Sequence, residues 1–306
     1  MTHERTKITP IIKWAGGKSK LYSQLRTKMP DALFNGQIKK YYEPFLGGGA
    51  VFLNIIQQVN IENCYISDIN EDLILLYTVV KNDPKKIIQF VNKFLLQYGA
   101  LSNNDKEKFY YDIRATYNIE RFNIDYEEYS ATYIPRAAQM VFLNKICYNG
   151  LYRQNMIGEF NVPFGKNYYP VLLKEDNINR LSEILKRVSV KCVDFQNICA
   201  DIEGSDSFVY FDPPYKSLNK KVSFTSYHKS NFSIQDQVRL SEVFKELDKR
   251  NVLLMMNNSC VLAESGLEPV EDFYKGFTID YISSNSTMSS IVSKRKKINE
   301  LIITNY

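Results

Sequence analysis

The sequence feature that most constrains the fold is the apolar run 208–211, which ends in Asp212-Pro213-Pro214-Tyr215. A short run without polar residues indicates a strand buried on both faces, as in parallel sheets. Proline cannot donate a hydrogen bond to a neighbouring strand, so this strand must end near Asp212. Because open parallel sheets bind ligands at the carboxyl ends of their strands, the tetrad is a candidate catalytic site.

The tetrad suits the attack of a weakly nucleophilic amine on a methyl group. The amino nitrogen of adenine or cytosine has its lone pair drawn into the ring, and acceptors on Asp212 and on the Pro213 carbonyl would hold its two protons. Tyr215 would stack on the planar base. The amine can release its proton after the transfer, so positioning matters more than base strength. The same turn also ends ordinary strands, and alone it leaves the function open.

A strand, a glycine turn and a helix are predicted near the N-terminus. Residues 41–45 lead into 47–49, three glycines, and an apolar pattern of helical spacing follows over 50–58. The next short strand ends at Asp68, about twenty residues beyond the glycines, where nucleoside-binding units place a carboxylate for ribose hydroxyls. A dehydrogenase would look similar, but the third glycine of the dinucleotide fingerprint is replaced by Phe52. This favours a nucleoside ligand without a pyrophosphate.

Gly17-Lys18-Ser19 resembles the end of a phosphate-binding P-loop. That motif requires glycine at position 12, where the chain has Ile12. A nucleotide triphosphatase is therefore not the interpretation that we favour.

Strands and helices alternate in the second half of the chain. Strands are predicted at 188–195, 208–211 and 252–256, a helix after the N-cap residue Ser233, and a closing hairpin from 277–282 and 301–304. Such alternation predicts a parallel sheet wrapped by helices on both faces. The intervening stretch 79–165 has helical patterns instead, at 105–117 and 137–146. It contains 16 Phe and Tyr residues against 11 basic and 9 acidic residues, so any nucleic-acid contact there must be local.

Composition excludes several classes of protein. A chain of 306 residues can hold one large domain with an insertion, and its net charge of +5 is compatible with a polyanionic partner without proving one. The five cysteines form no C-x-x-C pair and there are 2 histidines, which argues against zinc sites and disulfide frameworks. No apolar stretch approaches the roughly 18 residues of a membrane span. We expect a cytoplasmic protein.

Four motifs occur in an order that is typical of one enzyme family. They are Lys13-Trp14-Ala15-Gly16-Gly17-Lys18, Glu43-Pro44-Phe45-Leu46-Gly47-Gly48-Gly49, Ser67-Asp68-Ile69-Asn70 and Asp212-Pro213-Pro214-Tyr215. Two further stretches, 148–155 and 158–165, are similar to that family's DNA-recognition hairpin, and 224–228 to its loop beside the target base. Over nearly its whole length the chain resembles the Dam-type (alpha-group) family of DNA adenine-N6 methyltransferases.

The resemblance implies an α/β fold, the Rossmann-like, mostly parallel sheet of S-adenosylmethionine-dependent methyltransferases, with an inserted helical target-recognition domain that carries a β-hairpin. The catalytic domain would comprise residues 1–78 and 166–306, and the recognition domain 79–165. The implied enzyme is a site-specific DNA-methyltransferase (adenine-specific). It would convert S-adenosyl-L-methionine to S-adenosyl-L-homocysteine, without a metal. The target adenine must be flipped out, because its amino group faces into the duplex.

The resemblance also implies residue roles. The residues expected to hold the adenine are Asp212, Pro213, Pro214 and Tyr215. Those expected to line the cofactor pocket are Trp14, Lys18, Glu43, Pro44, Phe45, Gly47, Gly49, Asp68, Ile69, Asp194, Phe195 and Asp212, with Asp68 on the ribose hydroxyls. Those expected to contact DNA are Tyr148, Asn149, Leu151, Arg153, Asn155, Pro163, Lys166, Tyr227 and His228.

Sequence readout would depend on the recognition stretch. Arg153 would pair with a guanine edge and Asn155 with an adenine or a phosphate, while Tyr148 and Leu151 would wedge beside the vacated stack. Two alternatives stay open: Tyr148 and Leu151 would be hairpin core, or Arg153 would contact only phosphate. The resemblance favours GATC as the target, but relatives commonly place an arginine and an aromatic residue where this chain has Lys166-Asn167-Tyr168, which leaves the outer bases open.

The expected partner is double-stranded DNA, together with a cognate restriction endonuclease encoded elsewhere in the genome. We expect a monomer or weak dimer, associated with the nucleoid of a bacterium or with a phage. The same chemistry on cytosine N4, RNA or a protein glutamine is an alternative, although glutamine-directed relatives usually begin the tetrad with Asn. Transfer to cytosine C5 is excluded, because it needs a cysteine nucleophile, usually after proline, and the chain has no Pro-Cys pair. A catalytically silent DNA-binding protein is the remaining alternative.

Overall fold

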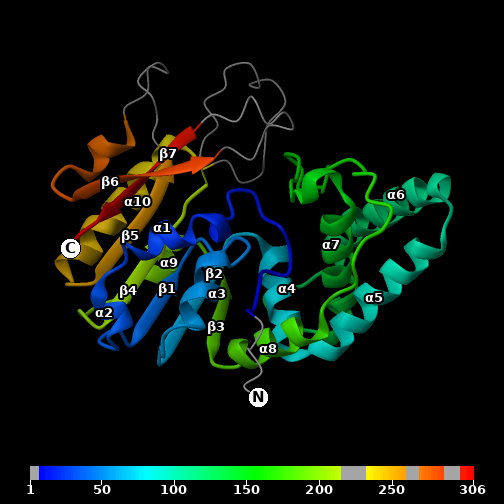
Figure 1. Ribbon diagram of the computed structural model, residues 1–306, viewed down its shortest axis with the longest axis horizontal. Coiled ribbons are helices and arrows are strands. Elements are labelled where there is room, and N and C mark those ends of the chain that lie inside the picture. The colour runs from blue at the N-terminus through cyan, green and yellow to red at the C-terminus, as the bar shows by residue number, and fades with distance from the viewer. Residues whose placement is uncertain (1–6, 215–231, 260–268, 286–296) are drawn as a thin grey trace.

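The computed structural model describes residues 7–214, 232–259, 269–285 and 297–306. Its centre is a seven-stranded sheet with the strand order β3-β2-β1-β4-β5-β7-β6 (Figure 1). The strands are β1 (Lys40–Glu43), β2 (Asn63–Asp68), β3 (Val188–Cys192), β4 (Ser207–Phe211), β5 (Leu253–Ser259), β6 (Thr278–Asn285) and β7 (Lys297–Thr304). Strands β1 to β5 pair in parallel, whereas β7 runs antiparallel to both of its neighbours. The predicted mostly parallel sheet, with an antiparallel closing pair, is confirmed.

Helices cover both faces of the sheet, because alternate residues of each buried strand point to opposite sides. Tyr41 of β1 and Tyr210 of β4 belong to one hydrophobic cluster, and Tyr42 and Val209 belong to the other. The helices are α1 (Tyr22–Arg26), α2 (Asp31–Phe34), α3 (Ala50–Ile56), α4 (Glu71–Asn82), α5 (Pro84–Ala100), α6 (Asn103–Glu120), α7 (Ile134–Ile146), α8 (Glu175–Leu185), α9 (Phe195–Cys199) and α10 (Ile234–Lys249).

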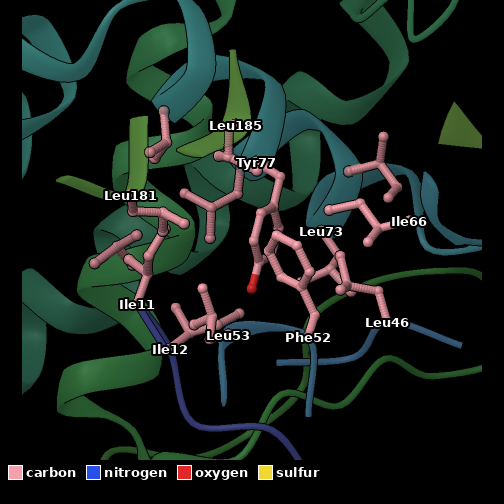
Figure 2. Close-up of a cluster of buried hydrophobic side chains, with 14 of the residues drawn as sticks. Ile11, Ile12, Leu46, Phe52, Leu53, Ile66, Leu73, Tyr77, Leu181 and Leu185 are labelled. Atoms are coloured by element: carbon pink, nitrogen blue, oxygen red, sulfur yellow. The ribbon is translucent and has the colours of Figure 1, made fainter. Parts of the chain in front are cut away.

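The first cluster lies on the side of α3, α4 and α8, and the second on the side of α9 and α10. Figure 2 shows part of the first cluster, where Tyr77 of α4 lies beside Phe52 of α3 and the leucines of α8. The sheet is thus buried on both sides, as its apolar strands predicted.

Helices α5, α6 and α7 lie together beside the sheet, drawn in cyan and green in Figure 1. The first hydrophobic cluster continues into them through Tyr98, Tyr110 and Phe142. The helical patterns predicted at 105–117 and 137–146 are confirmed as parts of α6 and α7. The division into a catalytic domain and a recognition domain at 79–165 stays a prediction. No helix in the described ranges is long and apolar enough to cross a membrane.

One local prediction differs from the structure. Strand β3 ends at Cys192 instead of continuing to Phe195, because Asp194 accepts a hydrogen bond from the Gln196 amide (2.9 Å) and so caps the start of α9. In contrast, the helix predicted after Ser233 is confirmed, and Ser233 forms a reciprocal capping box with Asp236.

The predicted β-hairpin at 148–165 is a loop that doubles back with two isolated antiparallel bridges, Cys147 to Phe164 and Gln154 to Phe160. Side chains of α6 bind much of its backbone in place of a partner strand. The Asn118 amide donates to the Phe160 carbonyl (3.1 Å) and accepts from the Phe160 amide (2.8 Å). The Tyr110 hydroxyl donates to the Val162 carbonyl (2.7 Å). We call residues 147–165 the recognition loop.

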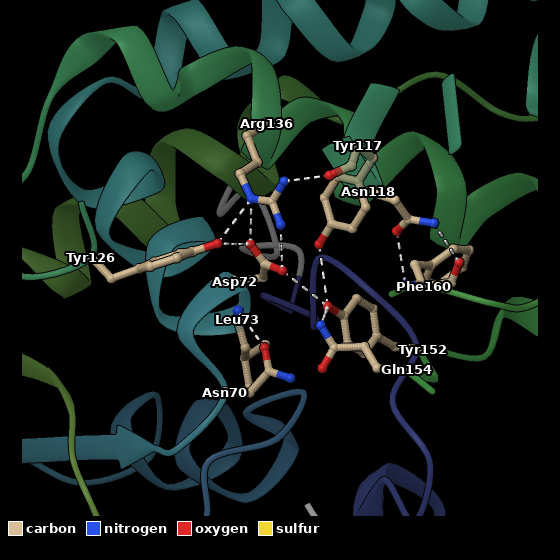
Figure 3. Close-up of polar contacts among 10 residues, drawn as sticks. All are labelled: Asn70, Asp72, Leu73, Tyr117, Asn118, Tyr126, Arg136, Tyr152, Gln154 and Phe160. Atoms are coloured by element: carbon tan, nitrogen blue, oxygen red, sulfur yellow. Dashed lines mark hydrogen bonds and ion pairs between the residues drawn. The ribbon is translucent and has the colours of Figure 1, made fainter. Parts of the chain in front are cut away.

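A buried ion pair joins α4, which follows β2, to α7 in the helical part (Figure 3). Arg136 donates from Nε to Asp72 Oδ1 (2.6 Å) and from Nη2 to Asp72 Oδ2 (2.9 Å), and both side chains are buried. Arg136 Nη1 also donates to the Tyr117 carbonyl (2.6 Å), and the Tyr126 hydroxyl donates to Asp72 Oδ1 (2.8 Å). Each charge is therefore compensated where water cannot reach it.

We expect Arg136→Met to lower the free energy of unfolding by about 3–5 kcal/mol, because it leaves the Asp72 carboxylate buried without its cation. The matched control is Lys39→Met, which removes the Lys39–Glu62 pair (3.1 Å), whose side chains are 46% and 57% exposed. That control should cost at most about 1 kcal/mol. Urea unfolding of the three proteins at pH 7 gives the comparison, and equal losses in both variants would contradict the assigned role.

Candidate active site

Acidic side chains gather at the carboxyl edge of the sheet. Strand β1 ends at Glu43, β2 ends at Asp68, and Asp212 follows β4. Strand β1 lies between β2 and β4, so the strand order reverses beside it. Open α/β sheets bind ligands at such a reversal, outside the carboxyl ends of the strands. The structure thus brings the glycine turn and the start of the tetrad to one place.

A buried lysine forms ion pairs with Asp212 and with Glu300 of β7. Lys18, in the short helix η1 (Lys18–Lys20), is 3% exposed, and its Nζ lies 2.9 Å from Asp212 Oδ1 and 3.6 Å from Glu300 Oε2. The same nitrogen donates to the Gly16 carbonyl (2.9 Å). Asn257 Nδ2 donates to Glu300 Oε2 (2.7 Å). The resemblance implies a place for Lys18 in the cofactor pocket, which stays a prediction, and the structure shows that Lys18 contacts Asp212.

Glu43 is buried beside this group. The Tyr41 hydroxyl donates to its carboxyl group. Burial, and then the nearby negative charge of Asp212, raise the pKa of Glu43 well above its ordinary value, although the Tyr41 and Phe52 hydrogen bonds oppose the shift. Glu43 therefore keeps its proton over a wider pH range than an exposed glutamate does. A neutral Glu43 also reduces the repulsion among the acids at the sheet edge.

We expect Glu43→Gln to change the pH dependence of stability. A carboxyl whose pKa is raised by folding contributes fully below its unfolded pKa of 4.5, and this contribution is lost as the pH rises through the folded value. Between those two values the wild-type free energy of unfolding should fall relative to Glu43→Gln, by up to about 1.4 kcal/mol per pH unit. Urea unfolding in steps from pH 4.5 to 8 measures the difference, and parallel curves would contradict it.

The glycine turn after β1 has a backbone that other residues adopt poorly. Gly47 and Gly49 have φ values of 49° and 70°, in the left-handed region. A Cβ atom on Gly47 would lie 2.9 Å from the Trp14 ring, so the indole packs directly on the turn. The Gly47 amide donates to Asp68 Oδ2 (3.0 Å), and the Asn70 amide donates to Asp68 Oδ1 (3.0 Å). Burial raises the pKa of Asp68. The turn, Trp14 and Asp68 form one unit.

An aromatic group lies on the α9 side of the turn. Phe45 stacks on Phe195 with ring centroids 5.3 Å apart, and Phe232 meets Phe45 edge-on at 5.6 Å. Arg239 Nη2 lies 2.7 Å from Asp194 Oδ1. Pro44 is buried, while Ile69 is 54% exposed. Pro44 and Phe45 follow β1, Ile69 follows β2, and Asp194 and Phe195 follow β3.

The residues expected to contact DNA are mostly exposed on the recognition loop. Tyr148 and Leu151 are 50% and 37% exposed, so neither is a core residue. Arg153, also exposed, donates from Nε to Asn161 Oδ1 (2.7 Å). Asn155 Nδ2 donates to Glu159 (3.0 Å). The remaining exposed members are Asn149, Pro163 and Lys166.

The structure does not test every expected site residue. Tyr215, Tyr227 and His228, and the stretch 224–228 that contains the last two, lie outside the described residues. Sequence reasoning missed Glu300 and Asn257. The available signal was a charged residue directly before the apolar run 301–303 in a predicted strand.

The site fits a methyl donor with a nucleoside part. Each carboxylate oxygen has two lone pairs, so the hydrogen bonds from the Gly47 and Asn70 amides leave Asp68 able to accept from ribose hydroxyls. The glycine backbone allows close approach, and aromatic faces lie nearby. Among the described residues, no group of His, Cys, Asp and Glu could hold a metal ion. The seven-stranded, mostly parallel sheet is consistent with the fold of S-adenosylmethionine-dependent methyltransferases.

Comparison with known proteins identifies the family. Residues 14–288 match the D12 class of N6 adenine-specific DNA methyltransferases, and the chain belongs to this family. It is 42% identical to the type II methyltransferase M.MjaIII of Methanocaldococcus jannaschii over 98% of this chain and 100% of the relative. It is 34% identical to M1.LlaDCHI of Lactococcus lactis (99% and 97%), and 33% identical to the DNA adenine methylase of Serratia marcescens (97% and 98%). The resemblance found from the sequence is confirmed.

Proposed function

We propose that this enzyme transfers a methyl group from S-adenosylmethionine to N6 of an adenine flipped out of duplex DNA. The observation that carries the proposal is the position of Asp212: it follows β4, beside the glycine turn of β1, with Lys18 at 2.9 Å. A carboxylate fixed beside the glycine turn can hold an amino group where a methyl group is presented.

On the cofactor side, Asp68 would hold the ribose hydroxyls and the glycine turn would lie against the adjoining part of the donor. Trp14 shapes the turn from one side, and Phe45 and Phe195 offer apolar surface from the other. The bound cofactor supplies an electrophilic methyl group. Because no carboxylate needs to be a strong base for this chemistry, the residues chiefly orient the reactants and exclude water.

On the substrate side, Asp212 and the Pro213 carbonyl accept the two amino protons of the adenine, which turns the lone pair of N6 outward. The Lys18 ammonium fixes the Asp212 carboxylate and stabilises its charge. Asp212 would also receive the proton that the methylated amine releases. Pro213 is buried and Pro214 exposed, and both keep the strand end rigid.

For DNA, we propose that the recognition loop enters the duplex with Tyr148 and Leu151 beside the vacated base, and that Arg153 reads a guanine. GATC is the target that family resemblance favours. Two relatives are named type II methyltransferases, which supports a restriction endonuclease as the cognate partner. The proposed location is the cytoplasm, at the nucleoid, and the proposed state is a monomer or weak dimer.

The decisive experiment is expression of the chain in a host that lacks adenine methylation, followed by modification-sensitive sequencing of the host genome. N6-methyladenine in one short motif supports the proposal and gives the target. Modification of cytosine would support the alternative substrate. A purified protein that binds duplex DNA but transfers no labelled methyl group would be a silent relative.

Substitutions of two aspartates should separate catalysis from cofactor binding. We expect Asp212→Ala to reduce methyl transfer by at least about 100-fold, because the amine loses its acceptor, with little change in cofactor affinity. Asp68→Asn should chiefly lower the affinity for the cofactor. The amide nitrogen of asparagine cannot accept a hydrogen bond, so the bond from either Gly47 or Asn70 is lost. Calorimetry of S-adenosylmethionine binding and single-turnover rates test both, and full activity of Asp212→Ala would overturn the assignment.

Arg153→Ala should reduce discrimination at one base pair by about 1–3 kcal/mol, because a bidentate contact to guanine is lost. Lys166→Ala serves as the control. An exposed lysine contacts phosphate as a point charge, so its loss should weaken binding to all DNA sequences alike. Competition binding with duplexes substituted at each position measures the effect. Uniform weakening by Arg153→Ala would show that Arg153 contacts phosphate.

A further inference from the structure

Tyr152 contacts residues of both predicted sites. Its ring stacks on Trp14, with centroids 5.0 Å apart and planes 14° from parallel. Trp14 in turn packs on Gly47, whose amide binds Asp68. A single aromatic pair therefore connects the recognition loop to the wall of the predicted cofactor pocket.

The hydroxyl of Tyr152 makes contacts of a different kind (Figure 3). It donates to Asp72 Oδ2 (3.2 Å), accepts from Gln154 Nε2 (2.9 Å) and lies 3.2 Å from the Tyr117 hydroxyl. Asp72 is the carboxylate of the buried pair with Arg136. Burial raises the pKa of Tyr152 well above its ordinary value, so the hydroxyl stays a donor at neutral pH. Asp72 thus fixes the Tyr152 hydroxyl, and the hydroxyl in turn fixes Gln154 of the recognition loop.

The neighbours of Tyr152 give these contacts a functional direction. Leu151 and Arg153 are exposed on the loop, whereas the ring of Tyr152 between them lies against Trp14. In extended chain, adjacent side chains point to opposite sides. Gln154, which donates to the Tyr152 hydroxyl, forms the antiparallel bridge with Phe160. Fixing Tyr152 therefore fixes the two side chains proposed to contact the bases.

We propose that Tyr152 is a positioning residue shared by the two sites: its ring sets the position of Trp14 beside the cofactor, and its hydroxyl sets the position of the base-reading part of the recognition loop. The inference rests on the proposed function, since it takes the Trp14 side as the cofactor wall and the loop as the DNA contact. It goes further by giving one side chain two separable tasks. A bound duplex that shifts the loop would be sensed at Trp14 through the same ring.

Two variants separate the tasks. Tyr152→Phe keeps the ring but removes the three hydroxyl contacts, whereas Tyr152→Leu removes the stack as well. The matched control is Tyr65→Phe, which removes a hydroxyl from another stacked pair, with Tyr42 (4.7 Å), on the sheet. Trp14 is the one tryptophan in the sequence, so its fluorescence reports the stack and cofactor binding directly.

We expect Tyr152→Phe to bind S-adenosylmethionine within about twofold of wild type, because the stack remains. Its discrimination between the target duplex and one substituted at the base pair read by Arg153 should fall about tenfold, as expected for lost buried hydrogen bonds. Tyr152→Leu should in addition lower the affinity for S-adenosylmethionine about tenfold. Its Trp14 emission should shift to longer wavelength, because the indole gains contact with water.

A third measurement tests the coupling. The dissociation constant of S-adenosylmethionine is measured from Trp14 fluorescence with and without target duplex, and the ratio should be closer to one in Tyr152→Phe than in wild type or Tyr65→Phe. If wild type binds no S-adenosylmethionine or modifies no duplex, the proposed function fails. If wild type does both, but Tyr152→Phe matches Tyr65→Phe in discrimination and coupling, the positioning role is overturned. Tyr152→Phe retains the ring and its packing, so the test holds even where Tyr152→Leu does not fold.

Discussion

The buried Lys18 ammonium group pairs with two acidic side chains at the carboxyl edge of the sheet, and the arrangement of this edge depends on those ion pairs. Several acids are crowded at the carboxyl edge of the sheet, and without a cation among them Asp212 and Glu300 would repel each other in a place that water hardly reaches. Lys18 belongs to the segment before β1, so this segment must lie across the edge of the sheet. The ion pairs of Lys18 therefore help to fix the position of the segment before β1.

That segment also joins the two parts of the molecule. The backbone of Lys13 exchanges two hydrogen bonds with the Asn144 side chain of α7 (2.9 Å each), and Trp14 lies between the glycine turn and the recognition loop. The Asp72–Arg136 ion pair makes a second connection, between α4 and α7. Charge and aromatic packing thus fix the recognition loop relative to the site, and the helices are not simply appended to the sheet.

Much of this architecture could be predicted because its causes are local. The apolar run before Asp212, the glycines at 47–49 and the pair Ser233 and Asp236 each determine nearby backbone through burial, left-handed φ values or capping. The four ordered motifs then identified the family, and the match over residues 14–288 confirmed it. Cofactor and DNA contacts of single residues stay predictions.

The rest depends on residues that are far apart in sequence, for which spacing carries no signal. Glu300 gains its role only when β7 pairs with β5, and the recognition loop forms no regular hairpin because α6 side chains bind its backbone. Strand β7 follows every other strand in the chain, yet it supplies the carboxylate that faces Lys18. During synthesis, domains fold from the N-terminus as the chain emerges. The group of charges around Lys18 is therefore completed only after β7 has left the ribosome, because Glu300 belongs to that strand.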